Sequence, residues 1–490
     1  MDASQIGKRA WSYAGVLQDA GLSCFEYVEQ LTLLLFLKMD DQQTEPPYNR
    51  QPLVPPELGW KTLLPLEGAW LEEKYREILE KLSLKQGMLG VIFKSARCEI
   101  NNPALLKQLI LNLIDKVDWL SLPVDVKGTI YEELLQRSAA ESSRGAGQYF
   151  TPRPVIQTMC EVVQPRPQDR ICDPAAGTGG FLCNAYQYVL NRYERDLDRD
   201  QKRKLREDLV EGMELSPKVG RMCAMNLYLH GIGGAVSPVS PRDSLLADTG
   251  ETFDLVLTNP PFGKRQSFST VNEAGAIERE RQDYVREDFT VTTSNKQLNF
   301  LQHIMKILKP GGTAAVVMPD NVLFEGGAGE TLRRRLLHAF RFHTLLRLPT
   351  GIFYKQGVKA NVLFFEKVAG GERIATDALW VYDLRTNQRF TLRERPLKRA
   401  DLDDFVACYR SRRRDRREDS ERFRRFGYEE LAKRDKLNLD ISWLKDDGHV
   451  DPDSLPPPDE VAAEIVENLE LALEKFRSVA ARLGGVERAV

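Results

Sequence analysis

Residues 170–181 read RICDPAAGTGGF, and this stretch decides the fold class. RICD is a short apolar run that ends in an acid, and a glycine-rich turn leads from it into a helical pattern. Gly177 and Gly179 let the backbone approach a ligand closely, and the first turn of the following helix can hold an anionic group. A strand, a glycine turn and a helix in this order predict a cradle for a nucleotide-like ligand. An ordinary strand-to-helix turn is the alternative.

Single positions exclude two related glycine-rich motifs. A dinucleotide-binding fingerprint needs a third glycine where this chain has Leu182. A phosphate-binding P-loop needs a hydroxyl residue after its Gly-Lys pair, but Gly263 and Lys264 are followed by Arg265. We therefore do not expect the chain to be a nucleotide-hydrolysing motor.

Strand-like and helix-like runs alternate around the cradle. The strand-like runs lie at 170–173, 209–213, 253–258, 312–318, 344–349 and 361–368. Apolar strands that alternate with helices predict an α/β fold, a parallel sheet with helices on both faces. The last two strands have a short glycine-containing connection, which predicts an antiparallel hairpin at the sheet edge.

The whole chain divides into three predicted regions. Residues 1–145 have apolar positions at helical spacing and predict a helical N-terminal domain, interrupted by a proline-rich loop at 44–56. Residues 146–385 contain the alternating pattern. Residues 386–490 are charged and predict a helical C-terminal region for subunit contacts.

Two acids follow later strands of the pattern. Glu214 ends the second strand, where an acid accepts hydrogen bonds from both hydroxyls of a ribose. Asp243 follows the presumed third strand and is placed to accept a hydrogen bond from an adenine amino group. Each could instead be an exposed acid at a strand end, but their order after the cradle favours ligand binding.

The sequence Asn259-Pro260-Pro261-Phe262 follows the fourth strand directly. An exocyclic aromatic amine is a poor nucleophile because its lone pair is delocalised into the ring. The Asn259 side-chain oxygen and the Pro260 carbonyl can accept its two hydrogens, which frees the lone pair to attack a methyl carbon. The two prolines stiffen the backbone, and Phe262 offers a face on which an extruded base stacks. A proline-rich turn without chemistry is the alternative.

GQYFTP at 147–152, the cradle at 173–181 and NPPF at 259–262 resemble, in this order, the amino-methyltransferases of DNA. The resemblance implies a Rossmann-like methyltransferase sheet that binds S-adenosylmethionine, with direct in-line methyl transfer. It also implies that Thr151 and Pro152 touch the methionine part of the cofactor and that Asp173 and Gly177 lie beneath it. The implied cofactor-binding residues are Gln148, Tyr149, Phe150, Thr151, Pro152, Asp173, Ala175, Gly177, Thr178, Gly179, Gly180, Phe181, Glu214, Asp243 and Asn259. The implied catalytic residues are Asn259, Pro260, Pro261 and Phe262.

The resemblance covers nearly the whole chain and is specific to the methylation subunit of type I restriction–modification systems. The segments that carry it include MPDNVLFEGGAGETLRRRLL (318–337) and YEELAKRDKLNLDISWL (428–444). It implies N6-adenine methylation of DNA by base flipping, with 146–385 as the catalytic domain. The implied partners are DNA, a specificity subunit that reads the sequence, a second methylation subunit held through it, and a restriction subunit.

Each of two C-terminal features has two interpretations. The final helix carries an apolar stripe that fits the helices of a specificity subunit or its own domain. The stripe consists of Val461, Ile465, Leu469, Leu473 and Phe476. The arginine run 410–417 could contact DNA phosphates, but interleaved acids favour a self-paired helix surface.

Composition adds few constraints. The 490 residues contain 69 bases and 71 acids, so the net charge of -2 gives no argument for nucleic-acid binding. The seven cysteines form no C-x-x-C pair and suit reduced thiols. None of the five histidines has metal-ligand spacing, so no metal is expected. We expect a cytoplasmic protein with no membrane segment, because no signal-peptide layout or spanning apolar run is present.

Other activities remain compatible with these motifs. The same NPP-aromatic geometry can methylate the N4 amine of cytosine or the side-chain amide of a protein glutamine. A catalytically silent scaffold that binds cofactor and DNA is the alternative from another class. The intact Asp173, Gly177, Asn259 and Phe262 argue against a silent scaffold.

Overall fold

The computed structural model describes most of the chain. The described residues are 3–122, 127, 128, 130–135, 150–262, 267–271, 277–281, 284–353, 357–370, 374–392, 394–410, 413–445, 462, 465, 466, 469 and 473. Side chains are described for the same residues except 3–5, 267–271 and 277–281. Within these residues, no helix combines the length and the apolar character that crossing a membrane requires.

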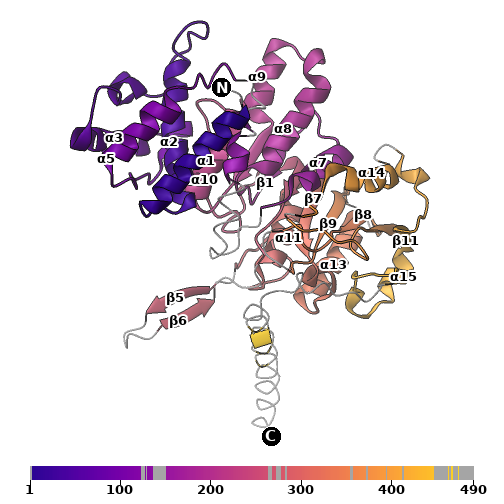
Figure 1. Cartoon of the computed structure of the whole chain (residues 1–490). Coiled ribbons are helices and arrows are strands. Elements are labelled where there is room, and N and C mark those ends of the chain that lie inside the picture. Colours follow the sequence, from indigo (N-terminus) through magenta and orange to yellow (C-terminus); the bar gives the residue numbers. More distant parts are fainter. Residues whose placement is uncertain are drawn as a thin grey trace.

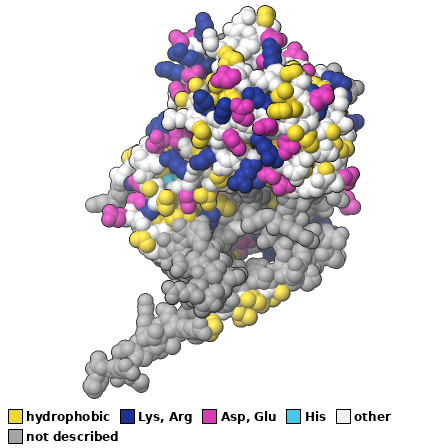
Figure 2. Space-filling view, turned by 90° about the vertical axis from the view of Figure 1, so that its left-hand side faces the viewer, with side chains coloured by type: hydrophobic (Ala, Val, Ile, Leu, Met, Phe, Trp, Pro, Cys, Tyr) yellow, Lys and Arg dark blue, Asp and Glu magenta, His cyan; other side chains and the backbone are white. Residues whose placement is uncertain are grey.

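The N-terminal region is helical, as its apolar spacing predicts. Its elements are α1 Ala3–Asp19, α2 Cys24–Gln42, η1 Pro56–Leu58, η2 Trp60–Thr62, α3 Gly68–Ser83, α4 Gly87–Phe93, α5 Pro103–Gln108 and the π-helical η3 Leu109–Ile114. Ser23 and Glu26 form a capping box at the start of α2, whose apolar residues are almost all buried. Figure 2 faces the side on which Figure 1 shows α3 and α5, and basic and acidic side chains are interspersed over the described part of that face.

A nine-stranded sheet forms the centre of the molecule, in the order β11-β10-β8-β9-β7-β4-β1-β2-β3. Its strands are β1 Ile171–Asp173, β2 Val210–Met213, β3 Val239–Ser240, β4 Phe253–Thr258, β7 Leu308–Pro319, β8 Phe340–Arg347, β9 Ala360–Lys367, β10 Ala378–Asp383 and β11 Phe423–Gly427. Only β9 and β11 run antiparallel to their neighbours. A separate hairpin of β5 Ser267–Val271 and β6 Ile277–Arg281 extends away from the body of the molecule (Figure 1).

Helices cover both faces of the sheet because its central strands are apolar on both sides. Leu255 and Leu257 of β4 pack in the cluster that contains α7, α8 and α14, whereas Val256 packs in the cluster that contains α11 and α13. The remaining helices are α7 Arg153–Val163, α8 Gly180–Tyr193, η4 Glu194–Asp196, α9 Arg199–Asp208, α10 Pro217–Leu229, α11 Lys296–Ile307, α12 Asn321–Phe324, α13 Ala328–Ala339, η5 Arg399–Leu402, α14 Asp403–Tyr409, η6 Arg414–Arg416, α15 Tyr428–Ala432 and η7 Asp435–Leu437. This confirms the predicted α/β fold class.

α10 joins the N-terminal helices to the sheet. Met222 and Met225 on one side of α10 pack in the core of the N-terminal helices, while Cys223 and Leu227 pack in the core of the sheet. Arg221 is fully buried, pairs with Glu29 of α2 and donates hydrogen bonds to backbone carbonyls of α4 and of the residue after it. The N-terminal helices therefore pack directly on the central domain.

Three expectations for the C-terminal half are corrected. The predicted hairpin exists as β8 and β9, but it lies inside the sheet rather than at its edge, because β10 and β11 extend the sheet beyond β8. The region after 385 is not wholly helical, since β11 pairs with β10. The described residues of the arginine run form no long helix, although Arg410 and Arg413 do pair with the neighbouring acids Glu418 and Asp415. Arg417 is buried against the carbonyl of Tyr409, and Arg414 pairs with Glu366. The domain boundaries stay a prediction.

Candidate active site

The carboxyl ends of β1, β2 and β4 meet at one edge of the sheet and border a cavity of about 470 Å³. The chain runs from β1 to β2 and β3 on one side and then crosses to β4 on the other, so β1 and β4 form a topological switch point. Crevices of α/β sheets bind ligands at such a point. The residues that line the cavity are Phe150, Thr151, Ile156, Asp173, Pro174, Ala175, Ala176, Gly177, Thr178, Gly180, Phe181, Met213, Glu214, Leu215, Ser216, Val219, Asp243, Ser244, Asn259, Pro261, Phe262, Lys296 and Phe300.

The glycine turn after β1 bends under this cavity through two left-handed residues. Gly177 has a φ of 54° and Gly179 a φ of 84°, a conformation that side-chain-bearing residues rarely adopt. The two glycines face different surroundings. Gly177 lines the cavity, whereas a Cβ on Gly179 would lie 2.9 Å from the Cys223 sulfur. Gly179 therefore serves the close packing of α8 against α10.

Two carboxylates stand at the ends of β1 and β2, and Glu214 is the more exposed of the two. Asp173 is completely buried and accepts a hydrogen bond from the Ala175 amide at 3.0 Å. Burial raises the pKa of Asp173 to about 7, and the charge of nearby Glu214 adds to the shift. Glu214 accepts hydrogen bonds from the amides of Gly177 at 3.1 Å and Ser216 at 2.8 Å. Burial also raises the pKa of Glu214, although these bonds and the Lys296 charge oppose the rise.

A hydrogen bond joins the two motifs that lie farthest apart in the sequence. The Asn259 amide nitrogen donates to the Thr151 hydroxyl at 2.8 Å, and Thr151 is buried. This bond fixes the orientation of the Asn259 side chain and therefore the direction of its amide oxygen. Phe262 packs edge-on against Phe353, with ring centroids 6.1 Å apart. The cavity thus brings Thr151, Asn259 and Phe262 together.

Asp243 is held in place at another part of the cavity wall. One carboxylate oxygen accepts from the Leu245 amide at 2.9 Å, and the other accepts from the Tyr284 hydroxyl at 2.8 Å. Tyr284 packs with Leu245 and Phe300 in a small apolar cluster beside the cavity. Asp243 therefore lines the cavity with Tyr284 bound to it, a contact that the sequence did not indicate.

The comparisons with known proteins agree with one another. The family model N-6 DNA Methylase matches residues 123–446. The StySPI methylase subunit of Salmonella potsdam and the EcoKI methylase subunit of Escherichia coli strain K12, both from type I restriction enzymes, are each 36% identical over all of this chain and 97% of their own length. The chain belongs to the N-6 DNA methylases.

Solved structures support the same placement. The crystal structure of the EcoKI M protein is 33% identical, covers 98% of this chain and 96% of its own, and has a TM-score of 0.53. A chain from a type I R-M system is 26% identical and covers 99% of both chains with a TM-score of 0.74. This methylase is therefore an adenine-specific DNA methyltransferase of the type I methylase subunits, and its methyl donor is S-adenosylmethionine.

The cavity of this methylase fits its cofactor in size and charge. Its volume lies within the roughly 300–1,000 Å³ that is typical of small-molecule sites. S-adenosylmethionine carries a sulfonium cation, and a cation beside Asp173 and Glu214 would favour their ionised forms, which burial disfavours. Glu214 would hold the ribose, and the first turn of α8 at Gly180 offers amide donors.

Most of the predicted site residues that the structure describes line this cavity. Pro152, Gly179 and Pro260 do not, and Gln148 and Tyr149 lie outside the described residues. Lys296 and Phe300 were not predicted, and the start of α11 brings them to the cavity from far along the chain. No motif surrounds either residue, so their positions became visible only in the fold.

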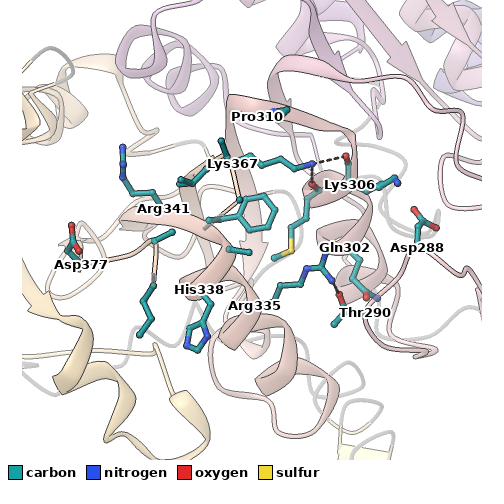
Figure 3. A pocket seen from close by; sticks show the side chains of 18 residues that line it. Asp288, Thr290, Gln302, Lys306, Pro310, Arg335, His338, Arg341, Lys367 and Asp377 are labelled. Carbon is teal, nitrogen blue, oxygen red and sulfur yellow. Dashed lines mark hydrogen bonds between the residues drawn. The ribbon is translucent and has the colours of Figure 1, made fainter. Parts of the chain in front are cut away.

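A second cavity, of about 580 Å³, lies at the opposite edge of the sheet (Figure 3). It is bordered by the first residues of β7 and β8 and by Lys367 at the end of antiparallel β9. The Lys367 ammonium donates to the Leu308 carbonyl at 2.7 Å, and Arg341 pairs with Glu366 at 3.2 Å. Its basic side chains thus serve local pairs, and amino ends of parallel strands are not where such sheets bind ligands.

Proposed function

We propose that Asn259–Phe262 is the catalytic segment of this methylase and that the cavity at β1, β2 and β4 is its cofactor site. The observation that carries the proposal is that Asp173, Glu214 and Asn259, each at the carboxyl end of a different parallel strand, line one cavity. The hydrogen bond from Asn259 to Thr151 supports it, because that bond links the catalytic segment to the predicted cofactor segment.

The proposed chemistry requires no covalent enzyme intermediate. S-adenosylmethionine, when bound, supplies an electrophilic methyl group. The Asn259 amide oxygen and the Pro260 carbonyl accept the two hydrogens of the adenine amine and so direct its lone pair toward the methyl carbon. Phe262 stacks on the extruded base and offsets part of the cost of flipping, which is a few kcal/mol. None of the described cysteines lines the cavity, and burial raises the pKa of Cys160 to about 12.

We further propose that the chain works as the modification subunit of a type I restriction–modification complex. Its partners are DNA, a specificity subunit, a second methylation subunit held through the specificity subunit, and a restriction subunit. The related chain of the type I R-M system comes from work on complex assembly and conformational transition in that system. We also propose a cytoplasmic location, where DNA and S-adenosylmethionine are both present.

The C-terminal stripe is our candidate for contact with the specificity subunit. Ile465, Leu469 and Leu473 are helical and recur every fourth residue, and 53%, 64% and 51% of their surfaces are exposed. Exposed apolar residues at this spacing are typical of helices that pack against a partner. Val461 and Phe476, which complete the predicted stripe, lie outside the described residues.

The test is methyl transfer from labelled S-adenosylmethionine into unmethylated DNA, with the chain alone and with its specificity subunit. We expect label on adenine N6 only when both subunits are present. The Asn259→Ala variant should bind S-adenosylmethionine and assemble with the specificity subunit, but transfer label far more slowly than the wild type. Label on cytosine, or full transfer by the variant, would refute the assigned catalytic segment. Equal transfer without the specificity subunit would refute the proposed division of labour.

A further inference from the structure

Three side chains with metal-binding atoms meet in the interior, away from the cofactor cavity. Glu132 comes from the helical residues 130–135, Cys183 from α8, and His230 directly follows α10. All three are buried, and their ligand atoms lie within 4.8 Å of one another. The Glu132 Oε1 atom is 3.8 Å from the His230 Nε2 atom, too far for a hydrogen bond.

His230 and Glu132 each have a contact outside the cluster. Each therefore keeps one possible ligand atom that faces the centre of the cluster. The His230 Nδ1 atom lies 2.8 Å from the Asn226 carbonyl, so Nδ1 carries the proton and the Nε2 lone pair faces the cluster. Arg153 pairs with the Glu132 Oε2 atom at 3.1 Å. Among the described residues, the Glu132 Oε1 atom has no hydrogen-bond partner. An imidazole oriented through its other nitrogen is the usual arrangement of a metal-binding histidine.

The surroundings leave room on one side of the cluster. The three side chains and Arg153 border a cavity of about 600 Å³ that also contains Cys160 in its wall. Gly128 also packs against the imidazole, so closely that a Cβ there would lie 2.2 Å from Nε2. Any larger residue at 128 would displace the ring. The backbone therefore holds the histidine in place while the cavity leaves an approach open.

We propose that Glu132, Cys183 and His230 bind a zinc ion whose fourth position faces this cavity. Nitrogen, sulfur and oxygen donors together suit Zn²⁺, and three protein ligands with one open position is a common zinc arrangement. Tetrahedral zinc ligands lie on the order of 3.5 Å apart, so the side chains close in by about 1 Å on binding. Thiolate and carboxylate together neutralise the ion, and the Cys183 proton leaves to solvent.

The ion would connect two parts of the molecule. Glu132 belongs to the segment that leads toward Thr151, while Cys183 lies in the first turns of α8, which begins at the cradle residue Gly180. Binding would therefore fasten the helical residues 130–135 to the helices behind the cofactor site. No histidine spacing in the sequence indicates this cluster, and a zinc ion here would differ from the expectation that the chain binds no metal.

The experiment uses the full chain, stripped with a chelator and titrated with Zn²⁺ and, separately, Co²⁺. We expect one equivalent of either ion, a thiolate-to-cobalt charge-transfer band, and a higher melting temperature with zinc. Cys183→Ser and His230→Ala should each weaken binding by about tenfold or more. Cys160→Ser, which changes a thiol in the wall of the same cavity, should bind like the wild type.

Three results would overturn the proposal. The first is no stoichiometric binding by the wild-type chain, and the second is cobalt binding without the charge-transfer band. The third is binding by Cys183→Ser and His230→Ala with wild-type affinity. If Cys183→Ser fails to fold, Cys160→Ser decides in its place. A charge-transfer band that persists in Cys160→Ser excludes the other thiol of the cavity wall, and a band that Cys160→Ser loses overturns the proposal.

Discussion

Each of the two edges of the central sheet carries a cavity. Among the described residues, the acids that line one cavity form no ion pair, whereas bases that line the other pair with acids. At the carboxyl edge, Asp173 is buried and Glu214 is partly buried, and burial raises the pKa of both. At the amino edge, partly exposed bases pair with acids: Lys306 with Asp248 at 3.2 Å, and Arg341 with Glu366. Buried carboxylates cost stability unless hydrogen-bond donors or a positive charge join them, so a ligand that supplies either should bind at the carboxyl edge, whereas the charges of the amino edge are already paired.

The sharpest test of this contrast is Asn259→Ala. We expect methyl transfer to fall by about 100- to 1,000-fold, because one of the two acceptors fixed for the reacting amine is removed. S-adenosylmethionine binding should stay close to that of the wild type. Single-turnover methylation and equilibrium binding of the same preparation separate the two effects. Near-normal transfer would mean that the carboxyl edge binds the cofactor without performing the chemistry.

A second test removes one acid of the carboxyl edge. Glu214→Gln should weaken S-adenosylmethionine binding by roughly 10- to 100-fold, the effect of losing hydrogen bonds to a charged group. Glu211→Gln is the matched control, since Glu211 lies on the same strand but pairs with Arg170 outside the cavity. Calorimetric titration measures both. Equal losses in the two variants would point to a general effect on β2 rather than a ligand contact.

A third test uses the pH dependence of stability. The pKa of Asp173 is about 7 in the folded chain and near 4 in the unfolded chain, so between these values the folded state retains a proton that the unfolded state has released. The stabilising contribution of Asp173 to the free energy of unfolding is therefore fully present below about pH 4 and is lost as the pH rises through 7. Asp173→Asn should flatten that slope and raise the melting temperature at pH 8. Identical slopes for the variant and the wild type would contradict the assigned cause.

The smallest effect is expected at the amino edge. Arg341→Ala removes a half-exposed partner of Glu366, which Arg414 also contacts. We expect a change below about 1 kcal/mol in the free energy of unfolding and unchanged methyl transfer. Chemical denaturation and the methylation assay measure the two. A large loss of activity would show that the amino edge takes part in function after all.

The central strands were predictable because each is a contiguous apolar run. β4 and β9 coincide with the predicted segments to within a residue. β11 was missed because only Phe423 of this edge strand is buried, while Arg424 and Arg425 are exposed, so it shows neither an apolar run nor a regular alternation. The hairpin was placed at the edge because the strands β10 and β11, which lie beyond it, were not predicted.

In the candidate site, too, some residues were predictable from the sequence and others were not. Parallel strands deliver the residues after them to one edge, so the cradle, Glu214 and Asn259 were predictable from local sequence. Lys296 and Tyr284 reach the same region through contacts that no local pattern encodes. The Glu132–Cys183–His230 cluster was invisible for a related reason, because its members lie far apart along the chain and converge only where three helical segments pack.

Helix α10 packs both in the core of the N-terminal helices and in the core of the sheet. This limits which hybrids of this chain with a related methylase can fold. Its outer side supplies Met222 and Met225 to the N-terminal core, and Arg221 is buried among groups of α2 and α4. A hybrid of two related methylases that is spliced near residue 145 would therefore combine one parent's N-terminal helices with the other parent's α10. Such a hybrid should fold poorly, whereas a graft that carries α10 together with the N-terminal helices keeps the joint intact. The N-terminal helices and α10 thus form one packing unit, although they are separated in the sequence.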